Sequence, residues 1–353
     1  MSKKTVVGII FLIFFGSLAG VFVTYTQFTR PSSPTDASEV VFEVPQGKAF
    51  LTVAKELESQ GLVSNSTLFS LYARIKGQAG KMKVGEYSLR RNMTPSEILD
   101  VLISGKSIGR SFVVAEGLNI FEIAEQYEAQ GFGTRNEFLL SCRDPEFVRS
   151  LLGSSFESLE GYLFPETYQL TKFTSTRELI RGMVAKFQEV YEQTIPVNEM
   201  HGMTKHQIVT LASLIEKETG APEERPNISS VFHNRMKKGM MLQTDPTILY
   251  GMALESGKMI LKISRADITR PTRYNTYTIR GLPPGPISNP GKESLLAAIR
   301  PATTDYLFFV SNNDGTSTFT KDLSAHNRAV HKTQIDPNAR KGKSWRDLKK
   351  KEK

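Results

Sequence analysis

The sequence predicts an α+β protein with one N-terminal membrane-spanning helix, a small strand–helix module and a larger mixed domain. Three observations support this fold class. Residues 6–25 carry no charge, a strand–helix pattern begins at Val44 and again at Val114, and a long apolar helix near Leu211 is followed by irregular polar segments. At 353 residues the chain is long enough for two or three domains with substantial cores.

The N-terminal segment has the length of a membrane span. Lys3 and Lys4 precede the uncharged residues 6–25, and about 20 apolar residues are enough for a helix to cross a bilayer. A cleavable signal peptide is the alternative, but the run is long for one and no A-x-A site follows it. We expect an uncleaved anchor, with residues 1–5 in the cytoplasm. The Pro/Ser-rich residues 26–39 are expected to form a flexible stalk.

A repeat follows the stalk. Val44–Gly61 and Val114–Gly131 share Val, Gly, Ala, Glu, Gln and Gly at matching positions. Each copy predicts a short strand, a glycine turn and an amphipathic helix that ends at glycine. Between the copies, Gly85–Leu89 predicts a strand, and Thr94–Glu97 predicts a helix start with a cap and a proline at its first position.

The run Gln207–Glu218 predicts a helix that carries two carboxylates among apolar residues. Thr204 and Gln207 form a capping-box pattern, and Gly220 marks the end. Glu216 and Glu218 fall on opposite flanks of the apolar arc, and burial there would raise a carboxyl pKa toward neutrality. Residues two apart do not face each other, so one of them is the catalytic acid or neither is. The pattern alone does not choose between them, and a structural glutamate at a helix edge is the ordinary alternative.

Irregular segments follow this helix. Met241–Gly251, Arg273–Tyr277 and Gly281–Gly291 are polar or rich in Pro and Gly, and loops of this kind commonly hold binding and catalytic groups. The Pro-Gly segment is expected to form a fixed cleft wall. Farther on, Leu307–Val310 and Ser317–Thr320 predict a β-hairpin.

These motifs resemble the MltG (YceG-like) family of endolytic murein transglycosylases, and the resemblance covers nearly the whole chain. The matching segments are Leu211–Thr219, Val231–Arg235, Leu242–Thr247, Tyr274–Tyr277 and Gly281–Ile287, with Leu159–Tyr168 upstream and His326–Asn327 downstream. The resemblance implies that Glu216, the first glutamate of Ile-Glu-Lys-Glu, is the essential acid. The residues expected to contact the sugar are Gln243, Thr244, Asp245, Tyr274, Asn275, Tyr277 and Glu166.

The implied reaction is non-hydrolytic cleavage of the β-1,4 bond between N-acetylmuramic acid and N-acetylglucosamine in peptidoglycan. Glu216 would protonate the glycosidic oxygen and then accept the proton of the muramic C6 hydroxyl, which closes on C1 to leave a 1,6-anhydro end. One acid/base suffices because the nucleophile lies within the substrate. Two alternatives remain: a hydrolase that pairs Glu216 with Asp245 or Glu166, and a non-catalytic glycan-binding scaffold.

The resemblance also implies a domain order. Residues 40–110 are similar to a LysM-like module, which is a glycan binder or only a spacer, and residues 111–338 hold the linking region and the YceG-like catalytic domain. The anchor would place that domain on the periplasmic, extracytoplasmic side of the bacterial inner membrane. A short tether favours nascent glycan strands as substrate and peptidoglycan synthases (penicillin-binding proteins) as partners.

The composition narrows the classes of function that remain. The formal net charge is +9, but the basic tail at residues 339–353 supplies most of it, and no nucleic-acid-binding motif accompanies it. The five histidines show no metal-ligand spacing and there is no glycine-rich phosphate loop, so we expect neither a metal nor a cofactor. Cys142 is the only cysteine, which excludes an internal disulfide.

Overall fold

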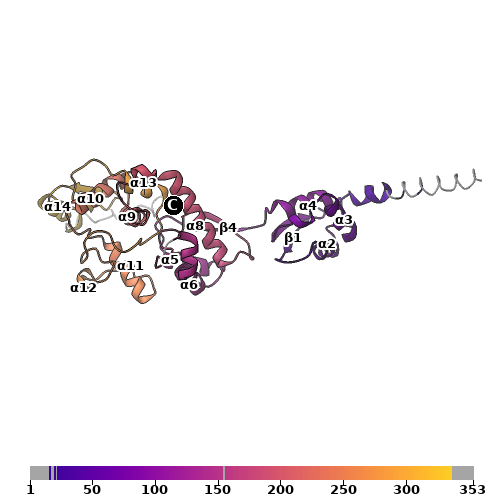
Figure 1. The fold of residues 1–353 in the computed structure, drawn as a ribbon, viewed down its shortest axis with the longest axis horizontal. Helices are drawn as coiled ribbons and strands as arrows, with labels where there is room; N and C mark the ends of the chain where they lie inside the picture. Colours follow the sequence, from indigo (N-terminus) through magenta and orange to yellow (C-terminus); the bar gives the residue numbers. More distant parts are fainter. Residues whose placement is uncertain (1–15, 17–19, 21, 154–155, 336–353) are drawn as a thin grey trace, which may run out of the picture. The chain divides into compact units, whose positions relative to one another are not determined.

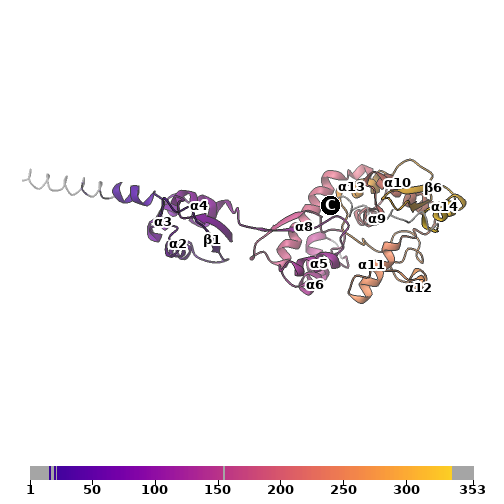
Figure 2. The same ribbon diagram turned by 180° about the vertical axis from the view of Figure 1, so that it is seen from behind.

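The structure, a computed structural model, describes residues 16, 20, 22–153 and 156–335. The chain divides into two compact units (Figures 1 and 2): unit 1 holds the described residues up to 111 together with 169–174, and unit 2 holds the rest. Among the described residues, none of the helices has the length and apolar character needed to cross a membrane. Most of the expected anchor, residues 6–25, lies outside the described residues.

Unit 1 is a two-stranded sheet covered by helices. Its elements are β1 (Glu39–Val44), α2 (Phe50–Ser59), α3 (Ser66–Ile75), η1 (Ala79–Lys81), β2 (Gly85–Arg90) and α4 (Pro95–Ser104). The two strands pair antiparallel with Phe42 opposite Tyr87, and both of these side chains are buried in the core with Phe69 of α3. The alternating strand pattern leaves Glu39, Val41 and Glu43 on the solvent face.

The helix of each repeat copy is confirmed, whereas the strands end at or just before the first residue of each copy, at Glu39–Val44 and Arg110–Val113. The strand expected at Gly85 and the helix expected at Thr94 are both confirmed, and Thr94 and Glu97 form a capping box with Pro95 at the first turn. The repeat helices also end alike: Gly61 and Gly131 have φ of 69° and 72°. Glycine adopts this left-handed conformation without steric cost, so the same residue pattern ends both helices in the same way.

The expected flexible stalk at residues 26–39 is wrong. A helix covers residues 22–28, and Phe28 at its end is buried in the core of unit 1, edge-on to Tyr72 with ring centroids 5.6 Å apart. The Ser33 N–H donates to the Arg91 carbonyl at 3.2 Å, and the Arg91 guanidinium pairs with Asp36 at 3.1 Å. The Pro/Ser composition indicated flexibility, but these polar groups and one aromatic ring find partners on the module.

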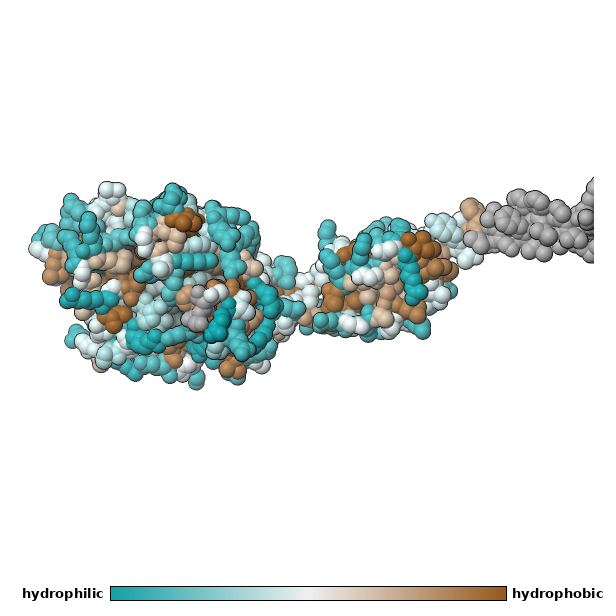
Figure 3. Space-filling model, viewed as in Figure 1, coloured by the Kyte–Doolittle hydropathy of each residue, from teal (hydrophilic) through white to brown (hydrophobic). Residues whose placement is uncertain are grey.

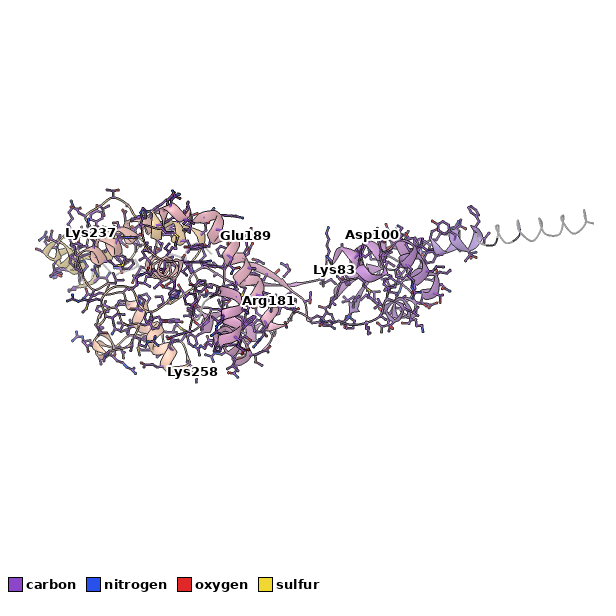
Figure 4. The ribbon with its side chains drawn as sticks, in the orientation of Figure 1. Lys83, Asp100, Arg181, Glu189, Lys237 and Lys258 are labelled. Carbon is purple, nitrogen blue, oxygen red and sulfur yellow. The ribbon has the colours of Figure 1, made fainter. Side chains whose placement is uncertain are left out.

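Strands β3 (Arg110–Val113) and β4 (Thr167–Leu170) form the second sheet, and the boundary between the units falls within both strands. The helices of the first half of unit 2 are α5 (Ile120–Ala129), α6 (Arg135–Arg143), α7 (Pro145–Leu152) and α8 (Thr176–Thr194), followed by η2 (Val197–Glu199). Helix α8 is amphipathic. Its charged residues Arg181 and Glu189 lie on the outside (Figure 4), whereas Met183 and Phe187 are buried.

Helix α9 lies at the centre of unit 2. The elements from there to the end of the described chain are α9 (Lys205–Glu218), η3 (Pro222–Glu224), α10 (Arg225–Lys237), α11 (Asp245–Ser256), α12 (Arg265–Thr269), α13 (Lys292–Ile299), β5 (Phe308–Ser311), β6 (Ser317–Thr320), α14 (Leu323–Val330) and η4 (His331–Ile335). Helix α9 packs against α10 and α13 on one side and α11 on the other (Figures 1 and 2). The predicted hairpin is confirmed as β5–β6.

The start of α9 is also as predicted, with Thr204 and Gln207 in a capping box. The helix is buried on all sides and not only along the predicted apolar arc. Residues 208–215 are all buried, so the helix has no solvent face over this stretch. Its two polar interior side chains satisfy themselves locally, since the Thr210 hydroxyl donates to the His206 carbonyl at 2.7 Å and the Ser213 hydroxyl to the Thr210 carbonyl at 2.7 Å. The side chains after Ile215 are therefore the first that can reach a cleft.

The Pro-Gly segment is rigid, as expected, but it runs through the interior. Residues 285–291 are all buried. The Ile287 N–H donates to the Ser213 hydroxyl at 3.1 Å, and the Asn289 amide donates to the Leu118 carbonyl at 2.9 Å. The segment lines two smaller hollows and does not line the main cleft.

Candidate active site

A cleft of about 990 Å³ opens in unit 2 where α9 ends, a size at the upper end for small-molecule sites. Three groups of residues form its walls: the helix end Lys217–Gly220, the segment at Leu242–Asp245 with Tyr277, and the residues of β5, the hairpin tip and α14. These segments lie far apart in the sequence. The buried body of α9 fixes the first wall, because a packed helix holds its last turn in one place.

Glu218 lies in this cleft at the last position of α9. The Thr244 hydroxyl donates to its Oε1. Burial raises the pKa of the Glu218 carboxyl to about 7; the Thr244 hydrogen bond opposes this rise, the Asp245 charge adds to it, and the Arg235 charge opposes it. Such a carboxyl is about half protonated at neutral pH and can both donate and accept a proton.

The segment opposite Glu218 is held in a single conformation. The Tyr277 hydroxyl donates to the Asp245 carboxylate at 2.7 Å, and burial raises the pKa of Tyr277, so this donor stays protonated. Gln243 has a φ of 49°, which is uncommon for a residue with a side chain and occurs often at functional sites. Its N–H donates to the Thr276 carbonyl at 3.1 Å, which stabilises this backbone conformation.

Arg235 joins two walls of the cleft. Its side chain comes from α10, the residue is 7% exposed, and its Nε donates to the Leu307 carbonyl at 2.7 Å while Nη1 donates to the Leu242 carbonyl at 2.7 Å. The guanidinium also lies over the Phe308 ring, 5.2 Å from its centroid. Nothing in the local sequence indicates that this residue is buried.

His326 of α14 lies in the wall formed by β5 and α14. Its ring stacks on Phe308 with centroids 5.2 Å apart, and burial with the nearby Arg235 charge lowers its pKa, so the ring is neutral at pH 7. Its buried Nδ1 has no hydrogen-bond partner within the described part of the chain. A neutral imidazole with a free nitrogen in this wall can accept or donate a hydrogen bond to a sugar hydroxyl or amide.

Glu216, the expected acid, does not line the cleft. Its side chain is 7% exposed, Oε2 accepts the Gly291 N–H at 3.0 Å, and Oε1 pairs with Arg225 at 3.3 Å. Arg225 also reaches Glu116 at 3.5 Å. Both Glu216 oxygens are therefore taken by protein donors, and one of these bonds caps the start of α13. Two residues two positions apart on a helix point to different sides, so Glu218 points into the cleft while Glu216 bonds to Gly291 and Arg225. The catalytic role that the resemblance implies for Glu216 stays a prediction.

Four of the expected sugar contacts gather around Glu218. Gln243, Asp245 and Tyr277 line the cleft, and the buried Thr244 bonds to the acid. All four follow from two short segments that the resemblance singled out. The structure adds Arg235 and His326, which come from other elements.

The other three expected contacts do not line this cleft, and their role toward the sugar stays a prediction. Asn275 is fully buried, and its amide donates to the Arg270 carbonyl at 2.7 Å, so it shapes the loop. Tyr274 packs on Tyr250 with ring centroids 5.0 Å apart and borders a separate hollow. Glu166 is exposed, pairs with Lys186 at 3.8 Å and does not line the cleft.

The fold and the site define an α+β protein in which a buried central helix ends with one protonatable carboxyl in a polar cleft. Residues 42–332 match the YceG-like family, and the chain belongs to this family. A protein of Bacillus subtilis (strain 168) named endolytic murein transglycosylase is 31% identical over 334 residues, covering 89% of this chain and 90% of that protein. A Streptococcus pneumoniae (serotype 2, strain D39) protein of the same name is 29% identical over 355 residues. This match covers 91% of this chain and 64% of that protein.

A solved structure shows the same fold. The crystal structure of a yceG-like protein from Listeria monocytogenes superposes with a TM-score of 0.57 at 32% sequence identity. The match covers 83% of this chain and 99% of that chain. The family expected from the sequence motifs is thereby confirmed.

Proposed function

We propose that the protein is an endolytic murein transglycosylase in which Glu218 is the single acid/base. Curated relatives along most of the chain carry this name, which describes a lytic transglycosylase, a carbon–oxygen lyase. One observation supports Glu218 as the acid/base: its carboxyl lines the cleft and has a pKa of about 7. The family resemblance pointed to Glu216, and the geometry favours its neighbour two residues on.

The first step is protonation of the leaving group. Because the Thr244 hydroxyl donates to Oε1 of Glu218, the proton of the neutral acid lies on Oε2. Transfer of this proton to the oxygen between muramic C1 and glucosamine C4 lets the C1–O bond break, and the glucosamine leaves with a 4-hydroxyl group. Positive charge then develops at C1, and the Asp245 carboxylate in the same cleft is placed to stabilise it.

The second step closes the sugar on itself. The Glu218 carboxylate takes the proton of the C6 hydroxyl of the same muramic residue, and O6 bonds to C1 to give the 1,6-anhydro ring. The acid is regenerated and no water enters the reaction. The nucleophile is part of the substrate, so its effective concentration is high and a second catalytic carboxylate is not needed.

A hydrolase is the second candidate, because one observation favours it. Asp245 is another carboxylate of the same cleft, and two carboxylates flanking a glycosidic bond are the usual machinery of glycoside hydrolysis. The pairing would be Glu218 with Asp245, since neither Glu216 nor Glu166 lines the cleft. The two functions differ in the end group they leave.

Mass analysis of products from purified glycan strands tests both. We expect wild type to release internal fragments with 1,6-anhydromuramic ends, Glu218→Gln to release almost none, and Glu216→Gln to remain active as a folded control. Free reducing ends would support the hydrolase instead. An intact substrate with wild-type protein would indicate a non-catalytic scaffold.

The location and the partners are further parts of the proposal. The uncharged residues 6–25 support an uncleaved anchor in the bacterial inner membrane, with both units on the extracytoplasmic side. The compact strand and helix arrangement of unit 1 supports a LysM-like glycan-binding module. Nascent strands and penicillin-binding proteins are the substrate and partners that an anchored enzyme can reach. A mature N-terminus beyond residue 25, or release from membranes without detergent, would refute the anchor.

A further inference from the structure

The helix of residues 22–28 runs antiparallel to α3. At its C-terminal end Phe28 contacts Tyr72, and one turn earlier Tyr25 is close enough to Lys76 to contribute to the raised pKa of that lysine. Moving from residue 28 to 25 therefore corresponds to moving from 72 to 76 along α3. Three residues more, about 4.5 Å at a helical rise of 1.5 Å per residue, bring Phe22 beyond the C-terminal end of α3.

The surface of unit 1 at this end of α3 is apolar and basic. Ile75 is 78% exposed and Leu71 is 52% exposed, although Ala73 on the opposite face of α3 is fully buried. Tyr25 is 57% exposed on the neighbouring helix, and apolar surface gathers on unit 1 beside that helix (Figure 3). The exposed Arg74 and Lys76 flank Ile75.

This combination is typical of groups at a membrane surface. Aromatic rings with a polar end concentrate at the headgroup level, and lysine and arginine extend their charged ends from apolar surroundings toward water and phosphate. Lys76 keeps its charge, since a hydrogen bond with the Tyr72 hydroxyl raises its pKa and Asp100 and Tyr25 add to the effect. Asp100, which is labelled in Figure 4, belongs to α4 and is an acidic group close enough to Lys76 to act on its pKa.

We infer that the outer face of α3, defined as Leu71, Arg74, Ile75 and Lys76 together with Tyr25, lies in the headgroup layer of an anionic lipid bilayer. This inference rests on the membrane anchor of the proposed function and deepens it. Residues 22–25 of the helix at this face belong to the uncharged run of residues 6–25. Unit 1 is then seated on the membrane, because the contacts of residues 28–36 with the module leave no free stalk to hold it away.

The opposite face of unit 1 provides a matched control. Val41 is 61% exposed on the solvent side of β1, and the neighbours that share this side are Glu39 and Glu43. An exposed aliphatic residue between two carboxylates does not suit an anionic surface. The core of unit 1 separates this face from the outer face of α3, since Phe42 and Phe69 point into that core from either side.

Depth-dependent fluorescence quenching tests the inference on the full-length chain. Ile75→Cys and, as control, Val41→Cys are labelled with a polarity-sensitive dye and reconstituted into vesicles of phosphatidylethanolamine and phosphatidylglycerol that contain nitroxide lipids. The native Cys142 is buried and should label little. We expect blue-shifted, strongly quenched emission at position 75 and emission typical of water at position 41. Equal quenching at both positions, or failure of the protein to float with the vesicles, would overturn the inference.

Two further measurements test the role of lipid charge and the catalytic activity separately. In vesicles of neutral phosphatidylcholine we expect weaker quenching at position 75, and equal quenching in the two lipids would rule out the contribution of the basic residues. Cleavage of soluble glycan strands by the labelled Ile75→Cys protein should match that of wild type, because this residue lies outside the catalytic cleft. Lost quenching with intact cleavage would refute the membrane face alone, and lost cleavage by wild type would refute the proposed function.

Discussion

Replacement of Glu218 by glutamine separates the two glutamates at the end of α9. Glutamine keeps the size of the side chain and can still accept the Thr244 hydrogen bond, but it cannot donate a proton as an acid. General acid–base catalysis contributes about 10² to 10⁴ in rate, and here one carboxyl serves as acid and then as base. We therefore expect turnover to fall by at least about a thousandfold.

The pH dependence gives a second measure. The wild-type acid is active when protonated, and burial raises its pKa to about 7. Turnover should therefore decrease about tenfold for each pH unit above this value, because the protonated fraction falls by that factor. Residual activity of Glu218→Gln should lack this decrease.

Stability should also fall as pH rises, but over a lower pH range than activity. The pKa of the Glu218 carboxyl is 4.5 when unperturbed and about 7 in the folded protein, so the folded state binds this proton more tightly than the unfolded state. The stability of wild type then falls as pH rises from about 4.5 to 7, by at most about 3 kcal/mol. Urea unfolding of Glu218→Gln across this range should show no such loss.

Glu216→Gln is the matched control. It removes the charge that pairs with the half-buried Arg225 and weakens the bond to the Gly291 N–H. We therefore expect a lower melting temperature and a loss of about 1–3 kcal/mol in the free energy of unfolding, with turnover within tenfold of wild type. The reasoning is refuted if Glu218→Gln keeps a tenth of wild-type turnover, or if folded Glu216→Gln is inactive.

Three other substitutions test the surroundings of the cleft. Thr244→Val removes a hydrogen bond that lowers the pKa of the acid, so the alkaline limb of the pH–rate profile should move to higher pH; an unmoved limb would contradict the cited contact. Asn275→Ala leaves part-buried carbonyl groups without this donor and should lower the free energy of unfolding by about 1–3 kcal/mol in urea. An unchanged free energy of unfolding would show that water replaces the amide. A Cβ at Gly220 would lie 2.5 Å from the Gly315 carbonyl oxygen, so Gly220→Ala should displace the hairpin wall and lower kcat. The control Gly182→Ala, in the open middle of α8, should keep kcat and add about 1 kcal/mol of stability. Equal kcat in both variants would show that the hairpin does not shape the cleft.

The sequence by itself determined the local elements and the family. The capping boxes at Thr94 and Thr204 start the helices that they predict, and Gly61 and Gly131 end two helices in the same conformation. Each of these signals depends on residues within about four positions along the chain, so the chain segment carries its own structural instruction. The order of the long motifs likewise identified the family, because it is a property of the sequence alone.

Only the tertiary structure decided which carboxyl faces the cleft. Glu216 and Glu218 have nearly the same sequence context, but the donors that distinguish them are Gly291, 75 residues from the first, and Thr244, 26 residues from the second. The same holds for Asn275, whose polar side chain predicts a ligand contact until its buried carbonyl partners are seen. A side chain's pKa and role depend on what distant segments bring against it, and helical periodicity gives only the side of the helix on which it lies.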